Sequence, residues 1–185
     1  MRFHLIVFLV FIGANLSCSW NIPDQVLISM LHGPNTDMRL SAIQNLSERD
    51  PNPRIIEALI QALQDPDITV QGAAVIVLGQ FGPKAIAALK PLATLVNSDD
   101  ETVSTIAISS IAKIGKNDPD ALDVMMSLLK SERENVRKIA AIQIAKLGQE
   151  ALNALPLLKE IAQNDESEAV RLAAEKSIAK LQGAG

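Results

Sequence analysis

The chain has 185 residues, of which 48% are hydrophobic but only 3% are aromatic, and tyrosine is absent. This composition suits thin layers of closely packed helices better than a β-sandwich, because strands favour aromatic side chains. The formal net charge of -4 at pH 7 gives no electrostatic reason to bind a polyanion, so we expect no nucleic acid among the partners.

The first 19 residues are typical of an export signal. An arginine near the start is followed by an uninterrupted apolar run over residues 5–14 and by small and polar residues over 15–19. This run is too short to span a bilayer, which needs about 20 apolar residues. We therefore expect residues 1–19 to be a signal peptide, residues 20–185 to form the folded domain, and the protein to be periplasmic or secreted.

The only cysteine, Cys18, lies at the end of this segment, so no intramolecular disulfide can form. A bacterial lipoprotein carries its lipidated cysteine at such a place, but the match is imperfect because Asn15 occupies the position that usually holds leucine. Two forms stay open. Either the mature protein is soluble and begins near Trp20, or a lipid on Cys18 anchors it to the envelope and provides its only contact with a membrane.

A repeated pattern fills the rest of the chain: an apolar residue, alanine four positions later, and a further apolar residue seven positions after that. The leading residues are Met38, Val70, Val103, Val136 and Val170, spaced by 32, 33, 33 and 34 residues. The first unit is the weaker match, because Arg49 takes its third position. Such nearly equal spacings indicate tandem repeats. Positions within a unit are counted from its leading residue, so Arg137 is at position +1 of the fourth unit.

Each unit is predicted to contain two helices. Apolar residues around the leading residue recur at the three- and four-residue spacing of a buried helical stripe, and another apolar stretch precedes them. A short polar turn between the two can cap the second helix. Gly82, Gly115 and Gly148 are expected to end second helices in the left-handed conformation. Pro91 and Pro156 are expected to kink or restart first helices. The units cover approximately residues 23–50, 53–82, 83–116, 118–148 and 149–182.

Several segments resemble HEAT repeats, particularly the short bacterial kind of the phycobilisome lyases. They are residues 82–92, 135–140, 154–158 and 169–174. The resemblance covers about residues 23–182 and implies an all-α solenoid of about five two-helix repeats, with the second helices on the concave side. Gln71 and Ser104 stand where the family usually has arginine, which interrupts the expected arginine ladder. One unit cannot bury its own apolar face, so neighbouring units must complete the core.

The chain offers few groups for catalysis. Histidine occurs only as His4, in the predicted signal, and His32. Metal enzymes need several convergent imidazoles or thiolates, and a catalytic triad would have to use His32 without any accompanying nucleophile motif. Paired carboxylates such as Asp99 and Asp100 are interpreted as helix caps. We therefore predict no enzyme, no metal and no cofactor, and no residue marks the bilin site of the phycobilisome lyases.

The remaining candidate for function is the surface of the second helices, with positions +1, +2, +5 and +6 expected on the concave side. In the middle units these helices are apolar on nearly all sides, either because neighbours bury them or because a strip is exposed and docks a partner. The strip would comprise Ile76, Ile108, Ile142, Arg137, Lys138 and Arg171. The favoured function is a protein-interaction or scaffolding module that binds another protein or peptide. The alternative is an accessory factor that presents a substrate protein to a separate enzyme, lyase-like or oxidoreductase-associated.

Overall fold

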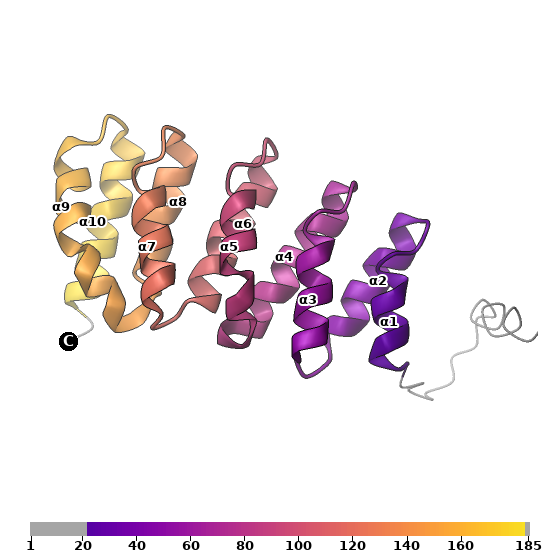
Figure 1. The fold of residues 1–185 in the computed structure, drawn as a ribbon. Helices are drawn as coiled ribbons and strands as arrows, with labels where there is room; N and C mark the ends of the chain where they lie inside the picture. Colours follow the sequence, from indigo (N-terminus) through magenta and orange to yellow (C-terminus); the bar gives the residue numbers. More distant parts are fainter. Residues whose placement is uncertain (1–21, 184–185) are drawn as a thin grey trace, which may run out of the picture.

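The structure is a computed structural model that describes residues 22–183 (Figure 1). Within this range every α-helix belongs to a pair, and the pairs stack side by side along one axis. The first helices of the pairs are α1 (Asp24–Met30), α3 (Pro53–Ala62), α5 (Leu89–Leu95), α7 (Pro119–Leu128) and α9 (Leu155–Asn164). The second helices are α2 (Thr36–Ser47), α4 (Ile68–Phe81), α6 (Glu101–Ile114), α8 (Glu134–Ile144) and α10 (Glu168–Gln182). The predicted all-α solenoid is confirmed, while the predicted signal and Cys18 lie outside the described residues.

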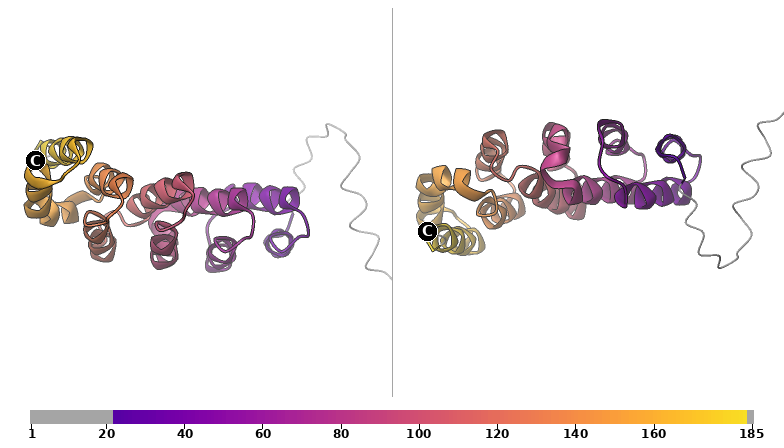
Figure 2. Two further views of the ribbon diagram at one scale, coloured as in Figure 1. Left: turned by 90° about the horizontal axis from the view of Figure 1, so that it is seen from above. Right: turned by 90° about the horizontal axis from the view of Figure 1, so that it is seen from below.

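The two sets of helices are spaced differently. The second helices form one closely packed row, whereas α1, α3, α5 and α7 stand apart on the other side, and the array bends toward the second-helix side at its C-terminal end (Figure 2). The tight spacing has a steric cause, since a β-carbon on Gly79 would overlap Ser110 of the next second helix. The Ser110 hydroxyl donates a hydrogen bond to the Val75 carbonyl at 3.0 Å. The second-helix side is therefore the inner side of the curve.

The core runs continuously through the stack. Alanine at position +4 is fully buried in all five units, at residues 42, 74, 107, 140 and 174, which lets the paired helices approach. The segment Ile68–Leu95 is long and apolar enough, by composition alone, to cross a membrane. In the array this segment is broken at Gly82, and its α4 part packs between α2 and α6. Its apolar character is that of a core helix.

The polar turns cap most of the second helices as predicted. Asn35, Asp67, Asp100 and Ser167 each accept a backbone N–H from the first turn of the helix that follows. The prediction is wrong for α8, whose N-cap residue is Arg133 and makes no side-chain cap. The long cationic side chain has no acceptor to offer a backbone N–H.

Proline and glycine act at the ends of helices. A 3₁₀ segment precedes α5 (η2, Gly82–Ala88) and α9 (η3, Gly148–Ala154), and Pro91 and Pro156 lie in the first turn of these helices, so the expected restart is confirmed. Gly82 has a φ of 57°. Gly115 does not adopt the predicted left-handed conformation, since its φ is -91°. Its lack of a side chain instead makes room for the methyl group of Ala121.

Candidate protein-interaction surface

One row of positions faces solvent on every second helix. Residues four apart lie on the same side of a helix, and positions +6 and +10 are exposed in all units except for the half-buried Ser109. We call this surface the second-helix face. At +6 it consists of Gln44, Ile76, Ser109, Ile142 and Lys176, and at +10 of Glu48, Gln80, Lys113, Lys146 and Lys180.

The structure divides the predicted apolar strip between this face and the core. Ile76 and Ile142 are each 45% exposed, as a docking strip requires. Ile108 is only 1% exposed and is therefore a core residue, which corrects its inclusion in the strip. The reason is its position, +5, where Val75 and Ala141 are also buried because the following unit covers this side of the helix. In the third unit the surface residue is Ser109 instead.

Arg137 is also not available to a partner, because it joins two neighbouring units. The residue is 7% exposed, and its guanidinium binds Asp165 through Nε at 2.9 Å and Nη2 at 3.1 Å. Nη1 donates to the carbonyls of Ser131 and Glu132. The hydrogen bond with Asp165 raises the pKa of Arg137. Burial would raise the pKa of Asp165, but hydrogen bonds from Arg137 and the Ser167 N–H hold it below its usual value. Arg137 is thus a structural tie.

The same kind of ion pair joins the first and second units. Neighbouring units that lack it also lack both of the residues that form it. Arg39, at +1 of the first unit, binds Asp65 at 2.7 and 2.9 Å and the Gly33 carbonyl at 3.1 Å. Asp65 and Asp165 both stand at position -5 of the unit that follows the arginine. Where +1 is the neutral Gln71 or Ser104, position -5 of the next unit is serine, at residues 98 and 131. The two positions therefore change together along the chain.

Neighbouring residues complete the turns that lack an arginine at +1. Gln71 donates from Nε2 to the carbonyl of Asp65, and the short Ser104 hydroxyl reaches only the Val96 carbonyl. Arg133 of the fourth unit reaches back to this turn and donates to the carbonyls of Val96 and Ser98 at 3.0 and 3.2 Å. This contact accounts for an arginine at an N-cap position.

Arg171 and Lys138 remain at least partly accessible. Arg171 donates from Nη1 to the carbonyls of Asp165 and Glu166, as Arg137 does to its own turn, but it forms no ion pair with any of residues 22–183. Lys138 is half-buried, and its Nζ donates to Asn135 Oδ1 at 3.1 Å. Both predicted residues therefore lie near the second-helix face without being its most exposed cations.

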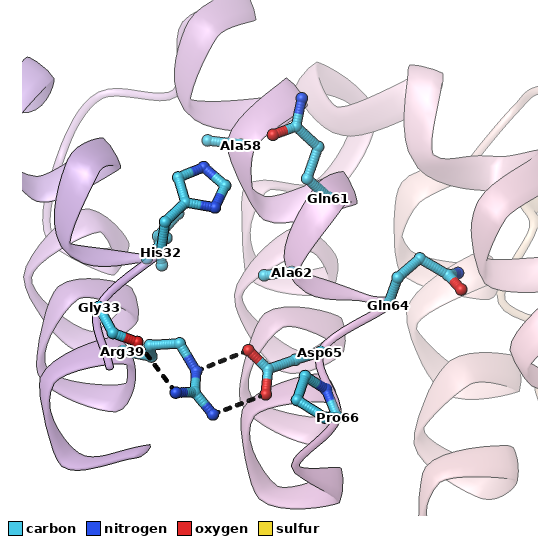
Figure 3. Close-up of a pocket in the computed structure, with 10 residues that line it drawn as sticks. His32, Gly33, Arg39, Ala58, Gln61, Ala62, Gln64, Asp65 and Pro66 are labelled. Atoms are coloured by element: carbon cyan, nitrogen blue, oxygen red, sulfur yellow. Dashed lines mark hydrogen bonds and ion pairs between the residues drawn. The ribbon is translucent and has the colours of Figure 1, made fainter. Parts of the chain in front are cut away.

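A hollow near His32 offers no catalytic arrangement. It lies between the first two units, with His32 and Gln61 near one end and the Arg39–Asp65 ion pair near the other (Figure 3). It contributes one exposed imidazole and the Asp65 carboxylate, which Arg39 already binds, and its wall contains no serine, threonine or cysteine. Over the part of the chain that the structure describes, no three His, Cys, Asp or Glu side chains gather as a metal site would require.

The comparisons with known proteins agree with this architecture. The family described as HEAT repeats matches residues 25–112 and 92–179, which together span most of the chain. The chain belongs to the HEAT-repeat family. A comparison with curated proteins finds no match.

Solved structures share the fold of this HEAT-repeat chain. The complex of CpcE and CpcF of phycocyanin lyase from Nostoc sp. PCC7120 has a TM-score of 0.66 and 19% identity, over 94% of this chain and 69% of that one. A designed armadillo repeat protein in complex with the peptide (KR)4 has a TM-score of 0.58 and 23% identity, over 84% and 80%. An engineered protein has a TM-score of 0.58 and 20% identity, over 88% and 80%. At these identities the likeness establishes the fold alone.

The HEAT array also aligns three lysines that the predicted strip did not include. Lys113, Lys146 and Lys180 occupy position +10 of three successive repeats and are exposed, and their side chains form no hydrogen bond or ion pair within residues 22–183. The signal was present in the sequence as lysine at three equivalent positions. The prediction placed positions +1, +2, +5 and +6 on the concave side, so it left position +10 out of the surface.

Proposed function

We propose that this HEAT-repeat protein is a non-enzymatic interaction module that holds another protein or peptide against its second-helix face. The observation that carries the proposal is the pair Ile76 and Ile142, which remain 45% exposed on the inner side of a curved array. Large apolar side chains on such a face gain free energy when a partner covers them. The peptide complex of a designed armadillo protein of similar fold is consistent with this use of a solenoid surface.

The proposal is tested by removing the two isoleucines. The double variant Ile76→Asp/Ile142→Asp should keep its fold, because both side chains are on the surface, and should lose its partner in a pull-down from the cells that make the protein. The matched control is Ile86→Asp/Leu152→Asp, since these side chains are each 42% exposed but lie in the 3₁₀ segments η2 and η3, outside the second helices. A partner retained by the control and lost by the first variant supports the proposal. Equal retention by both variants overturns it.

The predicted export is proposed as the location of this module. Its support is the apolar run of residues 5–14 and the small residues after it, as read from the sequence. Mass spectrometry of the mature N-terminus tests it directly. A chain that begins at Trp20 identifies the soluble form, and a diacyl-modified Cys18 identifies the lipoprotein. A mature chain that still begins at Met1 contradicts export.

The alternative, an accessory factor that presents a substrate protein to a separate enzyme, predicts a different kind of binding. A stable scaffold keeps its partner through washing, whereas an accessory factor releases the substrate protein once the enzyme has modified it. Dissociation rates measured with the unmodified and the modified partner separate the two. Equal slow dissociation of both forms supports the scaffold.

A further inference from the structure

We infer that the segment bound by the second-helix face is acidic, and that Lys113, Lys146 and Lys180 each bind one of its carboxylates. The inference rests on the proposed function and names the chemistry of its partner. These lysines are the exposed cations at position +10 of the last three units. Lys113 and Lys180 lie in the last turns of α6 and α10, and Lys146 lies in the turn directly after α8, so the three form a row across the C-terminal ends of neighbouring second helices. We call these three residues the lysine row.

The charges on this face are arranged in two edges. Positions -2, +2, +6 and +10 follow one another at intervals of four residues, so each lies about one turn further along the helix and is rotated by about 40° around it. At -2 the last three units carry Glu101, Glu134 and Glu168, and at +10 they carry the lysine row. Twelve residues separate the two edges, which corresponds to about 18 Å along a helix. The face is thus acidic along one edge and basic along the other.

The two edges differ in their contacts with neighbouring units. Glu101 accepts a hydrogen bond from Asn135 Nδ2 at 3.1 Å, and Glu134 accepts one from the Ser167 hydroxyl at 2.7 Å. These contacts join successive units. The lysine row has no such contact among the described residues. The face therefore keeps negative charge along one edge and offers unpaired lysines along the other.

This distribution favours a narrow acidic partner over a broad one. A nucleic-acid duplex or an anionic bilayer is wide enough to cover both edges, and its negative charge would then meet the glutamates as well as the lysines. An extended polypeptide is narrow enough to follow the lysine row alone. An acidic segment therefore satisfies the lysines without the repulsion that a wider polyanion would meet.

The spacing of the units sets the spacing of the carboxylates. Packed helices lie about 8–10 Å apart, and an extended chain in the polyproline II conformation advances about 3.1 Å per residue and presents every third side chain on the same side. One carboxylate at every third residue would therefore meet one lysine in each repeat. Ile142 is exposed in the last turn of α8, four residues before Lys146, so apolar residues between the carboxylates would contact it. Lys176 places a further cation in the same relation to Lys180.

A binding assay with a defined peptide tests the inference. The probe is a fluorescein-labelled peptide with glutamate at every third position and alanine and isoleucine between, and its counterpart carries lysine in place of glutamate. Fluorescence anisotropy is measured with the wild-type chain, with Lys113→Glu/Lys146→Glu/Lys180→Glu, and with the control Lys90→Glu/Lys130→Glu/Lys159→Glu. The control lysines are exposed on the first-helix side, so both triple variants have the same net charge.

We expect the wild type to prefer the acidic peptide and to bind it less tightly as salt is added. Reversal of the lysine row should weaken binding by about tenfold or more, since three favourable charge pairs become repulsive, and the control should change it by less than about twofold. Equal loss in both triple variants would show that net charge alone matters and would overturn the inference. Equal binding of the two peptides would do the same.

Two further outcomes separate this inference from the proposals around it. If the lysine-row variant loses affinity for vesicles containing anionic lipid while the peptide binds neither protein, the occupant is a membrane surface and the inference is wrong. If Ile76→Asp/Ile142→Asp loses the cellular partner but the lysine-row variant keeps it, the proposed interaction module is supported and the inference of an acidic partner is overturned. Loss of the cellular partner in both variants, with retention in both controls, supports both proposals.

Discussion

At the scale of single residues, Arg137 shows how a cation on a repeat protein can serve the fold and not a partner. Its guanidinium and the Asp165 carboxylate are both nearly buried. The guanidinium also donates to two backbone carbonyls, and the carboxylate also accepts a backbone N–H. Removing one partner of such a pair leaves an uncompensated buried charge, which costs far more than the pair itself contributes.

We expect Arg137→Ala to lower the free energy of unfolding by about 3 kcal/mol or more, because Asp165 loses its counter-charge in a buried site. The measurement is urea denaturation followed by circular dichroism. Lys146→Ala is the control, since this exposed lysine should change stability by no more than about 0.5 kcal/mol. A variant at Arg137 as stable as the control would mean that the tie between the fourth and fifth units contributes nothing.

The same pair predicts a dependence of stability on pH. The folded-state pKa of Asp165 lies below 3.8, its ordinary value, so the folded protein binds this proton less readily than the unfolded chain does. The stabilisation is therefore complete above about pH 4 and is lost as the pH falls through the folded-state pKa. Denaturation curves of the wild type should lose stability below pH 4 more steeply than those of Asp165→Asn. Parallel pH profiles would contradict this account.

At the scale of elements, the close packing of α4 against α6 depends on Gly79. The other glycine of α4, Gly72, is not needed for this packing. An alanine in place of glycine within a helix ordinarily stabilises it by about 1 kcal/mol. At Gly72 the nearest atom to an added β-carbon is Ile106 Cδ1 at 3.6 Å, an ordinary contact, whereas at Gly79 the carbon would overlap Ser110. The same substitution should therefore have opposite effects at two sites about two turns apart.

We predict that Gly72→Ala raises the melting temperature and that Gly79→Ala lowers it. Gly79→Ala should also lower the free energy of unfolding by about 1–3 kcal/mol, because the two helices must move apart. Thermal unfolding of the two variants beside the wild type checks both signs in one experiment. Stabilisation by both alanines would show that α4 and α6 separate without cost.

The elements were predictable from the sequence to different extents, for physical reasons. The second helices follow from the recurring apolar residue and alanine, because a buried helix repeats its contacts every three or four residues. Which side of each helix faces solvent did not follow, since Ile108 and Ser109 differ by one position and only the next unit decides which is covered. The ties of Arg39 to Asp65 and of Arg137 to Asp165 join different units and were missed. The matched change at positions +1 and -5 was their signal.

At the scale of the whole molecule, the stack ends where its contact sides become polar. The side of a second helix that meets the preceding unit includes position +3, as Ile106 beside Gly72 shows, and the side that meets the following unit includes +5. Position +3 is apolar in the four later units but Ser41 in the first. Position +5 is apolar in the first four units but Glu175 in the last. Polar ends of this kind prevent a repeat array from growing by stacking on itself.

Giving both ends the residues of an inner unit should therefore cause head-to-tail association. The two surfaces that Ser41→Ile and Glu175→Ile create are different from each other but complementary, and contacts of this kind do not close and so build open filaments. Sedimentation velocity at increasing protein concentration should show the wild type as a monomer and the double variant as a growing series of oligomers. The control Ser41→Ile/Lys176→Ile adds the same two isoleucines, but it puts one of them on the second-helix face and leaves Glu175 in place. Equal association of the two double variants would mean that added hydrophobicity, and not the matched ends of the solenoid, drives the assembly.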